Sequence, residues 1–148
     1  MRSAPPAADL LFDHVGIVVA DIEAGGGFLT GMLGPLSWTR RFDDARLGVA
    51  VRFARDQSGI VYELIAPLGD ASPVARTLKS RTDFLNQIAY RTSSIDSSVK
   101  RLRTMGALPV GAAAPALAFG GATIQFMRVP LGFLIELIEI DRIVHVFG

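Results

Sequence analysis

The sequence predicts a single α+β domain made of two tandem βαβββ units, each a strand and a helix followed by three strands. The first observation is a repeat, because residues 12–67 match residues 85–140 at a constant offset of 73 without a gap. The second is that the same order of hydrophobic patterns occurs in both copies. Identical pairs at this offset include Ile22/Ile95, Leu29/Leu102, Met32/Met105, Gly48/Gly121, Phe53/Phe126, Glu63/Glu136 and Leu64/Leu137.

Length and composition fit one compact domain. The chain has 148 residues, of which 50% are hydrophobic and 20% charged, so it has enough apolar surface to fold alone. We therefore interpret residues 1–148 as one domain. Its parts are a first unit at about 11–67, a linker helix at about 71–81, a second unit at about 84–140 and a C-terminal tail at 141–148.

In the first unit, residues 12–20 are rich in Val and Ile and predict a strand. Asp21 suits a helix N-cap, and an apolar stripe then runs to Gly34. The glycines at 25–27 weaken this helix, since an interior glycine costs about 1 kcal/mol relative to alanine. Either tertiary packing holds the segment or the helix begins later. Three strands follow at 36–42, 48–55 and 60–66, with a turn at 56–59.

Ser72-Pro73 predicts the N-cap and first position of a short connecting helix. The second unit repeats the pattern, with a strand at 85–92, a helix from Ser94 and Gly106 just past its end. Its last two strands fall at 122–128 and 133–140. The second strand of this unit is hard to place, because Pro109 and the GAAAPALAFGG stretch carry no clear pattern.

Charge and cysteine content exclude several classes of protein. The formal net charge is +1 and the basic residues are scattered, so we expect no nucleic acid partner. No apolar run approaches the roughly 20 residues that span a bilayer, and the N-terminal MRSAPPAADLL is too short and proline-broken for a signal peptide. We therefore expect no membrane partner and a cytoplasmic location. Without cysteine, any metal must be bound by nitrogen and oxygen.

Four polar residues stand at equivalent places in the two units. Glu63 and Glu136 each interrupt a strand that is apolar on both faces, and a buried carboxylate needs a charged partner, a metal or a proton. The alternative is an edge strand whose glutamate faces water. His14 and Gln87 lie on the first strand of each unit, with a small residue two positions on. If the units pack about a pseudo-twofold axis, these four side chains converge around a divalent cation.

The motifs HVGIVVADIE, YELIAPLGDASPVARTLKSR, LNQIAY, GGATIQF and IELIE, in this order and spacing, resemble the vicinal oxygen chelate superfamily and most of all its methylmalonyl-CoA epimerases. The resemblance covers about residues 11–140. It implies a curled eight-stranded mixed sheet around a cleft, a homodimer, a small-molecule substrate and one divalent metal ion. The metal would be held by His14, Glu63, Gln87 and Glu136. The resemblance does not choose among Zn, Ni, Co, Mn, Mg and Fe.

Two departures from the epimerase pattern bear on the activity. That pattern has His where this chain has Gln87 and usually Gln where it has Glu63, so the ligand set is in kind similar to that of eukaryotic glyoxalase I. The epimerases also use a glutamate on the third strand as a base, and Val51 stands near that place here. The MRVPLG segment after GGATIQF is shorter than the family's loop there.

The resemblance implies a metal-dependent lyase or isomerase/epimerase that transfers a proton next to a carbonyl, with Glu136 or Glu63 as the base. A dioxygenase is a weaker hypothesis, since its iron needs two histidines and the second one here, His145, lies in the tail. The alternative from another class is a non-catalytic binding protein of the antibiotic-sequestering type. Arg52 and Arg128, on or beside the inner strands, are candidates for contact with an anionic substrate.

Overall fold

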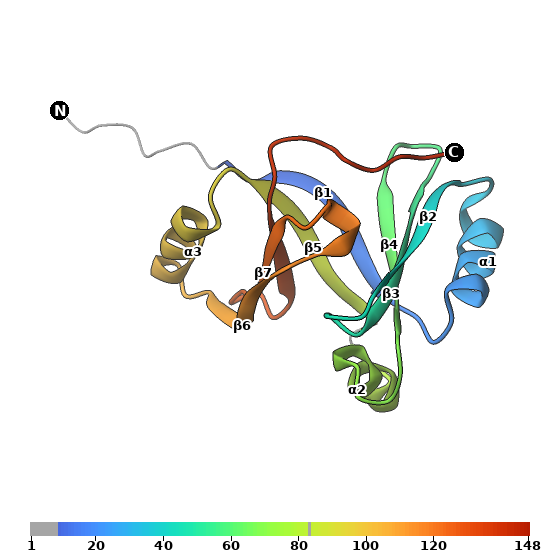
Figure 1. Ribbon diagram of the computed structural model, residues 1–148, viewed down its shortest axis with the longest axis horizontal. Coiled ribbons are helices and arrows are strands. Elements are labelled where there is room, and N and C mark those ends of the chain that lie inside the picture. Colours follow the sequence, from blue (N-terminus) through green and yellow to red (C-terminus); the bar gives the residue numbers. More distant parts are fainter. Residues whose placement is uncertain (1–8, 83) are drawn as a thin grey trace.

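The computed structural model describes residues 9–82 and 84–148 (Figure 1). The first module contains β1 (Leu11–Val18), α1 (Ile22–Leu33), β2 (Ser37–Asp44), β3 (Val49–Arg55) and β4 (Val61–Pro67). Helix α2 (Pro73–Ser80) joins it to the second module. That module contains β5 (Leu85–Thr92), α3 (Ile95–Thr104), β6 (Leu108–Pro115), the short 3₁₀ turn η1 (Leu117–Phe119), β7 (Thr123–Arg128) and β8 (Leu134–Glu139). The predicted α+β fold with two βαβββ units is confirmed.

The described strands form one eight-stranded mixed sheet in the order β2-β3-β4-β1-β5-β8-β7-β6. In each module the first strand pairs in parallel with the last, β1 with β4 and β5 with β8. The remaining pairs are antiparallel, and the antiparallel pair of β1 and β5 joins the modules at the middle of the sheet. The two halves are therefore related by a pseudo-twofold axis that passes between β1 and β5 (Figure 1).

Helices α1 and α3 cover the outer face of the sheet, one on each module. Ile22 and Leu29 of α1 pack against Leu64 of β4, and Ile95 and Leu102 of α3 pack against the equivalent Leu137 of β8. Strands β4 and β8 are therefore buried on both faces, which is why their sequences are apolar almost throughout. The residues that alternate with these, among them Glu63 and Glu136, point to the inner face.

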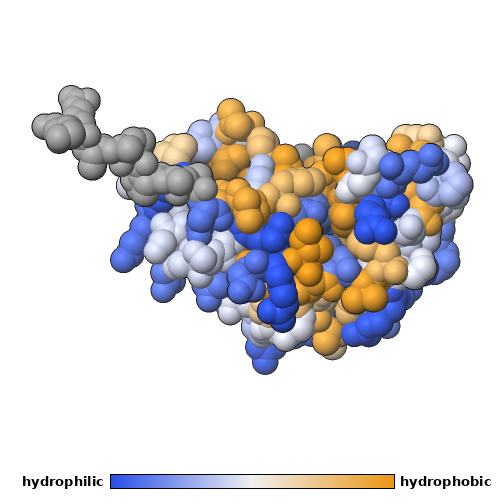
Figure 2. All heavy atoms as spheres, turned by 90° about the horizontal axis from the view of Figure 1, so that it is seen from above, coloured by the Kyte–Doolittle hydropathy of each residue, from blue (hydrophilic) through white to orange (hydrophobic). Residues whose placement is uncertain are grey.

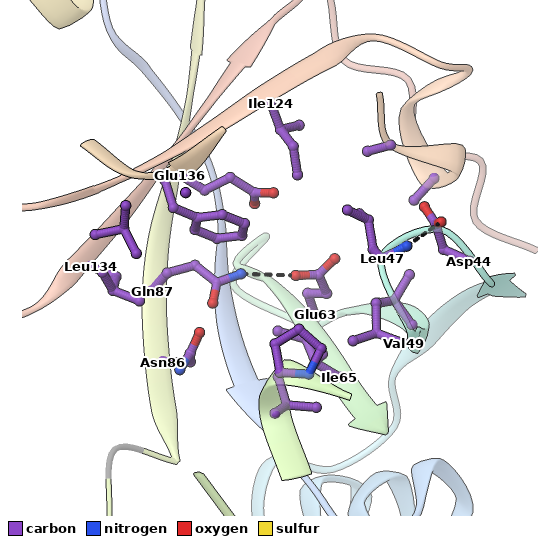
Figure 3. Close-up of a pocket in the computed structure, with 18 of the residues that line it drawn as sticks. Asp44, Leu47, Val49, Glu63, Ile65, Asn86, Gln87, Ile124, Leu134 and Glu136 are labelled. Carbon is purple, nitrogen blue, oxygen red and sulfur yellow. Dashed lines mark hydrogen bonds between the residues drawn. The ribbon is translucent and has the colours of Figure 1, made fainter. Parts of the chain in front are cut away.

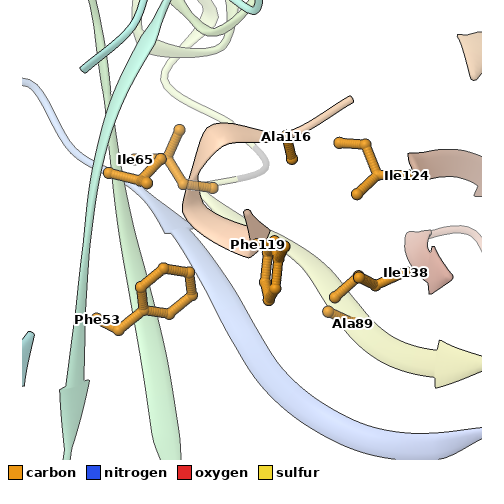
Figure 4. Close-up of a cluster of buried hydrophobic side chains, with 8 residues drawn as sticks. Phe53, Ile65, Ala89, Ala116, Phe119, Ile124 and Ile138 are labelled. Atoms are coloured by element: carbon orange, nitrogen blue, oxygen red, sulfur yellow. The ribbon is translucent and has the colours of Figure 1, made fainter. Parts of the chain in front are cut away.

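The inner face has its own apolar cluster, which draws on both modules (Figure 4). Phe53 of β3 and Phe119 of η1 meet edge to face, with ring centroids 5.8 Å apart. The tail adds Val144 and Phe147 to this cluster, and its Gly148 N–H donates to the carbonyl of Trp38 at 3.0 Å. The tail thus runs from β8 in the second module back to β2 in the first.

Helix α1 begins at Ile22 and contains all three consecutive glycines, so packing holds the segment. A Cβ on Gly26 would lie 2.9 Å from the indole of Trp38, and one on Gly25 would lie 2.8 Å from Val19. A Cβ on Gly27 would meet nothing within 4 Å. Gly25 and Gly26 let the helix pack closely against Val19 and Trp38. Gly27 makes no such contact, so it contributes only the entropic cost of glycine.

Replacing Gly27 with alanine is expected to raise the free energy of unfolding by about 0.5–1 kcal/mol, because the helix gains propensity without a clash. Replacing Gly26 with alanine should lower it by about 1–3 kcal/mol, because the new methyl group overpacks against Trp38. Urea denaturation of the two variants beside the unaltered chain measures both changes. Equal effects of the two substitutions would contradict the packing account of this helix.

The strand that the sequence could not place is β6, at the edge of the sheet. An edge strand needs fewer backbone donors than an inner one, so Pro109 is tolerated, and the register is irregular between Val110 and Ala114. Ser72 is the N-cap residue of α2 and Pro73 its first residue, as predicted, although the Ser72 hydroxyl makes no capping hydrogen bond to the helix.

No helix within residues 9–82 and 84–148 has both the length and the apolar character needed to cross a membrane. Residues 1–8, on which most of the signal-peptide prediction depends, lie outside the described part of the chain. Seen from above, apolar side chains gather in several patches separated by hydrophilic ones (Figure 2). Exposed apolar residues of the tail are Ile143 and Val146.

Candidate metal centre

The structure brings together the four polar side chains that the repeat singled out. They come from the four central strands, which stand in the order β4, β1, β5, β8. Their residues are almost completely buried, with exposed fractions of 0% for His14, 5% for Glu63, 3% for Gln87 and 4% for Glu136. The alternative of edge strands with water-facing glutamates is therefore wrong, because β4 and β8 are internal strands and both carboxylates are buried.

The polar ends of Glu63, Gln87 and Glu136 point toward one another (Figure 3), and the imidazole of His14 lies beside the two carboxylates. The Nε2 atom of His14 lies 3.3 Å from an Oε1 of Glu63 and 3.3 Å from the Oε1 of Glu136. The amide of Gln87 donates to Glu63 Oε1 at 3.1 Å. The ligating atoms of His14, Glu63 and Glu136 all lie within 4.8 Å of one another. The side chains thus present nitrogen and oxygen atoms to a common centre.

Three of these atoms are buried with no hydrogen-bond partner among the described residues: His14 Nε2, Gln87 Oε1 and Glu136 Oε1. Leaving a buried polar atom without a partner costs about 1–3 kcal/mol, so three at one point indicate a missing partner. Each of the three has a lone pair when His14 is neutral. A divalent cation satisfies all three at once, so the residues present fit a metal ion.

A β-bulge precedes the ligand candidate on the first strand of each module. In the β1–β5 pair the register shifts between Phe12 and His14, where Asp13 is the extra residue. It shifts again where β5 has Asn86 as the extra residue before Gln87. Asp13 and Asn86 are equivalent under the 73-residue repeat. A bulge places two consecutive side chains on one face, so Asp13 accompanies His14 inward and Asn86 accompanies Gln87.

Small residues across the strand pair make room for His14 and Gln87. Ala89 stands opposite His14, and Gly16 stands opposite Gln87. A Cβ on Gly16 would overlap the amide group of Gln87. The small neighbours expected from the sequence therefore have a specific function, because each one accommodates the ligand candidate of the other module.

Replacing Gly16 with alanine is expected to weaken divalent metal binding by about 10-fold or more, in the range seen when groups that orient ligands are altered. The new methyl group forces the Gln87 amide away from the position in which it faces the centre and holds Glu63. Competitive titration with a chromogenic chelator measures the change. Gly27→Ala is the matched control, and an equal loss in both variants would contradict this account.

Asp13 orients His14 through Nδ1, the ring nitrogen that faces away from the two glutamates. Its Oδ2 accepts from Nδ1 of His14 at 2.7 Å and from Nε2 of His145 at 2.7 Å, and Nε of Arg91 lies 3.4 Å from its Oδ1. With its proton held on Nδ1 by this carboxylate, His14 presents the lone pair of Nε2 to the centre. His145 reaches this place from the tail, where its ring packs 4.3 Å from that of Phe53.

Electrostatics around His14 favour a positive charge at the centre. Burial alone would lower the pKa of His14, but the charge of Glu63, the hydrogen bond to Asp13 and the nearby carboxylate of Glu136 raise it well above its ordinary value. Burial raises the pKa of Glu136, with the charge of Glu63 adding to the effect. Burial opposes ionisation of Asp13 as well, yet hydrogen bonds from the two histidines hold its pKa well below the ordinary value. A proton or a metal ion can supply the charge.

A cavity of about 410 Å³ opens onto this centre from the inner face of the sheet (Figure 3). Glu63, Gln87 and Glu136 lie in its wall beside Asn86 and Asp44. Asp44 accepts from the backbone N–H of Leu117 at 2.9 Å, and these two residues are equivalent under the repeat. The rest of the wall is mainly aliphatic and includes Leu47, Val49, Val51, Ile65, Val74, Val110, Ile124 and Leu134.

The structure does not bring the two candidate arginines into the cavity. Arg52 alternates with the inward-facing Val51, and its guanidinium lies over the Trp38 ring at 4.9 Å while its Nε donates to Thr39. Arg128 is the exposed last residue of β7 and is absent from the cavity wall. Val51, which stands near the expected place of a base, does line the cavity.

Sequence reasoning missed Asp13, Asn86 and Asp44, and left His145 without a role. Asp13 and Asn86 adjoin the ligand candidates in sequence, but strict alternation along a strand places neighbours on opposite faces. His145 lies in a segment outside the repeat, so it has no equivalent residue from which its role could be inferred.

Asp13, His14 and His145 form a second cluster of metal-binding residue types. Both histidines make hydrogen bonds of 2.7 Å to Asp13, so Nδ1 of His14 and Nε2 of His145 are already paired with this carboxylate.

Comparisons with known proteins agree with this architecture. A family model for the Glyoxalase/Bleomycin resistance protein/Dioxygenase superfamily matches residues 13–139. Among solved structures, methylmalonyl-CoA epimerase from Mycobacterium tuberculosis is 28% identical, with a TM-score of 0.74 over 96% of this chain and 94% of that one. A hypothetical protein from Bacillus halodurans C-125 is 26% identical, with a TM-score of 0.78 over 93% and 99%. No curated protein matches the sequence.

One further solved structure carries a ligand. A methylmalonyl-CoA epimerase in complex with methylmalonyl-CoA and NH4+ is 22% identical, with a TM-score of 0.71 over 88% of this chain and 94% of that one. At this identity the likeness concerns the fold.

Proposed function

Because the chain belongs to the glyoxalase/bleomycin resistance protein/dioxygenase superfamily, we propose that it is a metal-dependent enzyme that transfers a proton on the carbon next to a carbonyl group. It would act as an isomerase or epimerase, or as a lyase of the glyoxalase kind. The observation that carries this proposal is the set of three buried, unpartnered ligand atoms, of which those of Gln87 and Glu136 belong to residues in the wall of an apolar cavity. The epimerases among its structural neighbours favour the same class of reaction.

His14, Glu63, Gln87 and Glu136 would hold one divalent cation. When bound, the cation supplies a Lewis acid that polarises a carbonyl oxygen and stabilises the negative charge left when the neighbouring carbon loses its proton. Asp13 fixes the imidazole of His14 through its Nδ1, and Gln87 fixes Glu63 through the hydrogen bond of 3.1 Å. The aliphatic wall keeps water from the reacting carbon.

Glu136 is the better placed of the two glutamates to act as the base. Val51 offers no carboxylate at the third strand, and the carboxylate of Asp44 is held by two backbone N–H groups, so the base is assigned to a ligand glutamate. Glu63 accepts a hydrogen bond from Gln87, whereas Glu136 Oε1 has no hydrogen-bond partner among the described residues. Glu136 therefore loses less when it turns toward a substrate in the cavity.

Incubation with acyl-CoA thioesters and hemithioacetals in heavy water tests the reaction. The metal-loaded protein is expected to wash deuterium into the carbon next to the carbonyl of at least one of them, because the proton removed by the base exchanges with solvent. Mass spectrometry of the recovered compounds measures the incorporation. Exchange into none of them, with metal bound stoichiometrically, would contradict the enzymatic proposal.

The alternative is a non-catalytic protein that sequesters a small molecule in the same cavity. Val51 at the base position and the aliphatic wall favour it. The two buried glutamates oppose it, since an apolar binding cleft has no use for them. Metal content discriminates between the two, because failure to take up Mn, Co, Ni or Zn when they are supplied would favour the binding protein. The homodimer remains a prediction in either case.

A further inference from the structure

Among the described residues, the charged groups in the cavity wall all have the same sign. Three of its wall residues are acidic, namely Asp44, Glu63 and Glu136, and none of the described residues in its wall is Lys or Arg. Resting on the metal-dependent function above, we propose that the reacting end of the substrate is neutral. It is a ketone, a hydroxyketone or a thioester acyl group that carries no carboxylate.

The charges of the four ligand candidates balance that of a divalent cation. Glu63 and Glu136 supply two negative charges, whereas His14 and Gln87 bind as neutral ligands. The four together neutralise one divalent cation, so no net positive charge remains to attract an anion. A neutral carbonyl oxygen does not need a net positive charge, since it would interact with the cation through its dipole.

The cavity wall beyond the metal centre is also unfavourable for an anion. The carboxylate of Asp44 is 7% exposed as a residue and accepts from the N–H groups of Leu47 and Leu117 at 3.1 and 2.9 Å, so backbone donors hold it in place. The guanidinium of Arg52 lies over the Trp38 ring, and Arg128 lies outside the cavity wall. A substrate carboxylate would be buried beside like charges without a counter-charge, which is strongly unfavourable.

The cavity wall also has uncharged polar groups that a neutral ligand would use. Asn86 lies in the wall next to Gln87, because the bulge in β5 turns both side chains inward (Figure 3). Thr77 of α2 also lies in the wall. An amide and a hydroxyl donate to and accept from neutral oxygens, and neither supplies the charge that a carboxylate needs. The acyl group of methylmalonyl-CoA, the ligand of one structural neighbour, carries a carboxylate and falls outside the proposed class.

Two thioesters that differ in one group test this inference. In methylmalonyl-CoA the acidic carbon carries a carboxylate, and in 2-methylacetoacetyl-CoA it carries a neutral acetyl group in the same place. Isothermal titration of the metal-loaded protein is expected to show at least about 10-fold tighter binding of the neutral compound. Because the nucleotide is the same in both, the difference reports on the acyl end alone.

Thr77→Lys and Thr77→Met provide a matched pair of variants. Lysine adds a cation to the wall, and methionine adds a side chain of similar length without charge. The lysine variant is expected to lose the preference for the neutral compound by about 10-fold, and the methionine variant to retain it. Circular dichroism verifies that both variants are folded before binding is compared.

Failure of this inference differs from failure of the proposed function. Equal or tighter binding of methylmalonyl-CoA by the unaltered protein overturns the inference, even if deuterium exchange proceeds. Binding of neither compound overturns it as well. A retained preference for the neutral compound with no deuterium exchange supports the inference and contradicts the enzymatic function.

Discussion

Replacing Glu136 with glutamine is expected to abolish stoichiometric binding of a divalent metal, with a loss of affinity of at least about 100-fold. The substitution keeps the size and shape of the side chain but removes one of the two negative charges that face His14 Nε2. Metal ligands that carry charge contribute most of the affinity of an oxygen-rich site. An amide oxygen in the same place is a weak replacement.

The same substitution separates stability from binding. A bound ligand raises the free energy of unfolding by about 2.7 kcal/mol at 100 times its Kd, so the unaltered protein should be stabilised when metal is added. Added metal should not raise the free energy of unfolding of the variant. Without metal, the variant should be as stable as the unaltered protein, because its buried amide replaces an unpartnered carboxylate oxygen. Thermal unfolding with and without metal measures both.

Glu23 of α1 provides the control for this experiment. It lies in the first turn of the helix and is exposed, so Glu23→Gln removes one carboxylate from the surface only. That variant should bind metal as the unaltered protein does. Full metal affinity in the Glu136 variant would count decisively against the proposed site.

Replacing Asp13 with alanine is expected to lower the free energy of unfolding by about 3–5 kcal/mol, the usual cost of removing one partner from a buried ion pair. The side chain of Asp13 is 1% exposed, and its carboxylate accepts from His14 and from His145. Arg91 also lies beside it, at 3.4 Å. Its loss leaves the two histidines without their acceptor and Arg91 without the charge beside it, at the junction of both modules and the tail.

An exposed ion pair gives the matched comparison. Arg41 and Asp43 are 2.8 Å apart, but their side chains are 45% and 59% exposed. Asp43→Ala should therefore cost less than about 1 kcal/mol. Urea denaturation at constant pH compares the two variants. A small loss for Asp13→Ala, similar to that for Asp43→Ala, would show that the network around Asp13 contributes little to stability.

The repeat made the fold and the four central side chains predictable. A constant offset of 73 residues equates Glu63 with Glu136 and His14 with Gln87, and symmetry then places equivalent residues around one axis. The pattern also indicated which strands are buried on both faces, since β4 and β8 are apolar throughout apart from their glutamates. These features follow from local periodicity and from duplication, both of which can be read along the chain.

Features that depend on register or on distant contacts could not be predicted. The bulges at Asp13 and Asn86 are invisible to the repeat, because both modules have one at the same place and the offset does not change. Strand β6 lacks a pattern because an edge strand tolerates proline and small residues. The hydrogen bond of His145 to Asp13 joins residues 132 positions apart, in a segment with no counterpart in the first module.

The two bulges make the site asymmetric, because they carry different residues. A centre with true twofold symmetry would accept a small substrate in two equivalent orientations, related by rotation about the axis between β1 and β5. Here the bulge of β1 carries an aspartate turned toward His14 and the tail, and the bulge of β5 carries an asparagine turned toward the cavity. In the proposed reaction the two orientations would therefore differ in energy, and one face of a planar carbonyl compound would be presented to Glu136 in preference to the other.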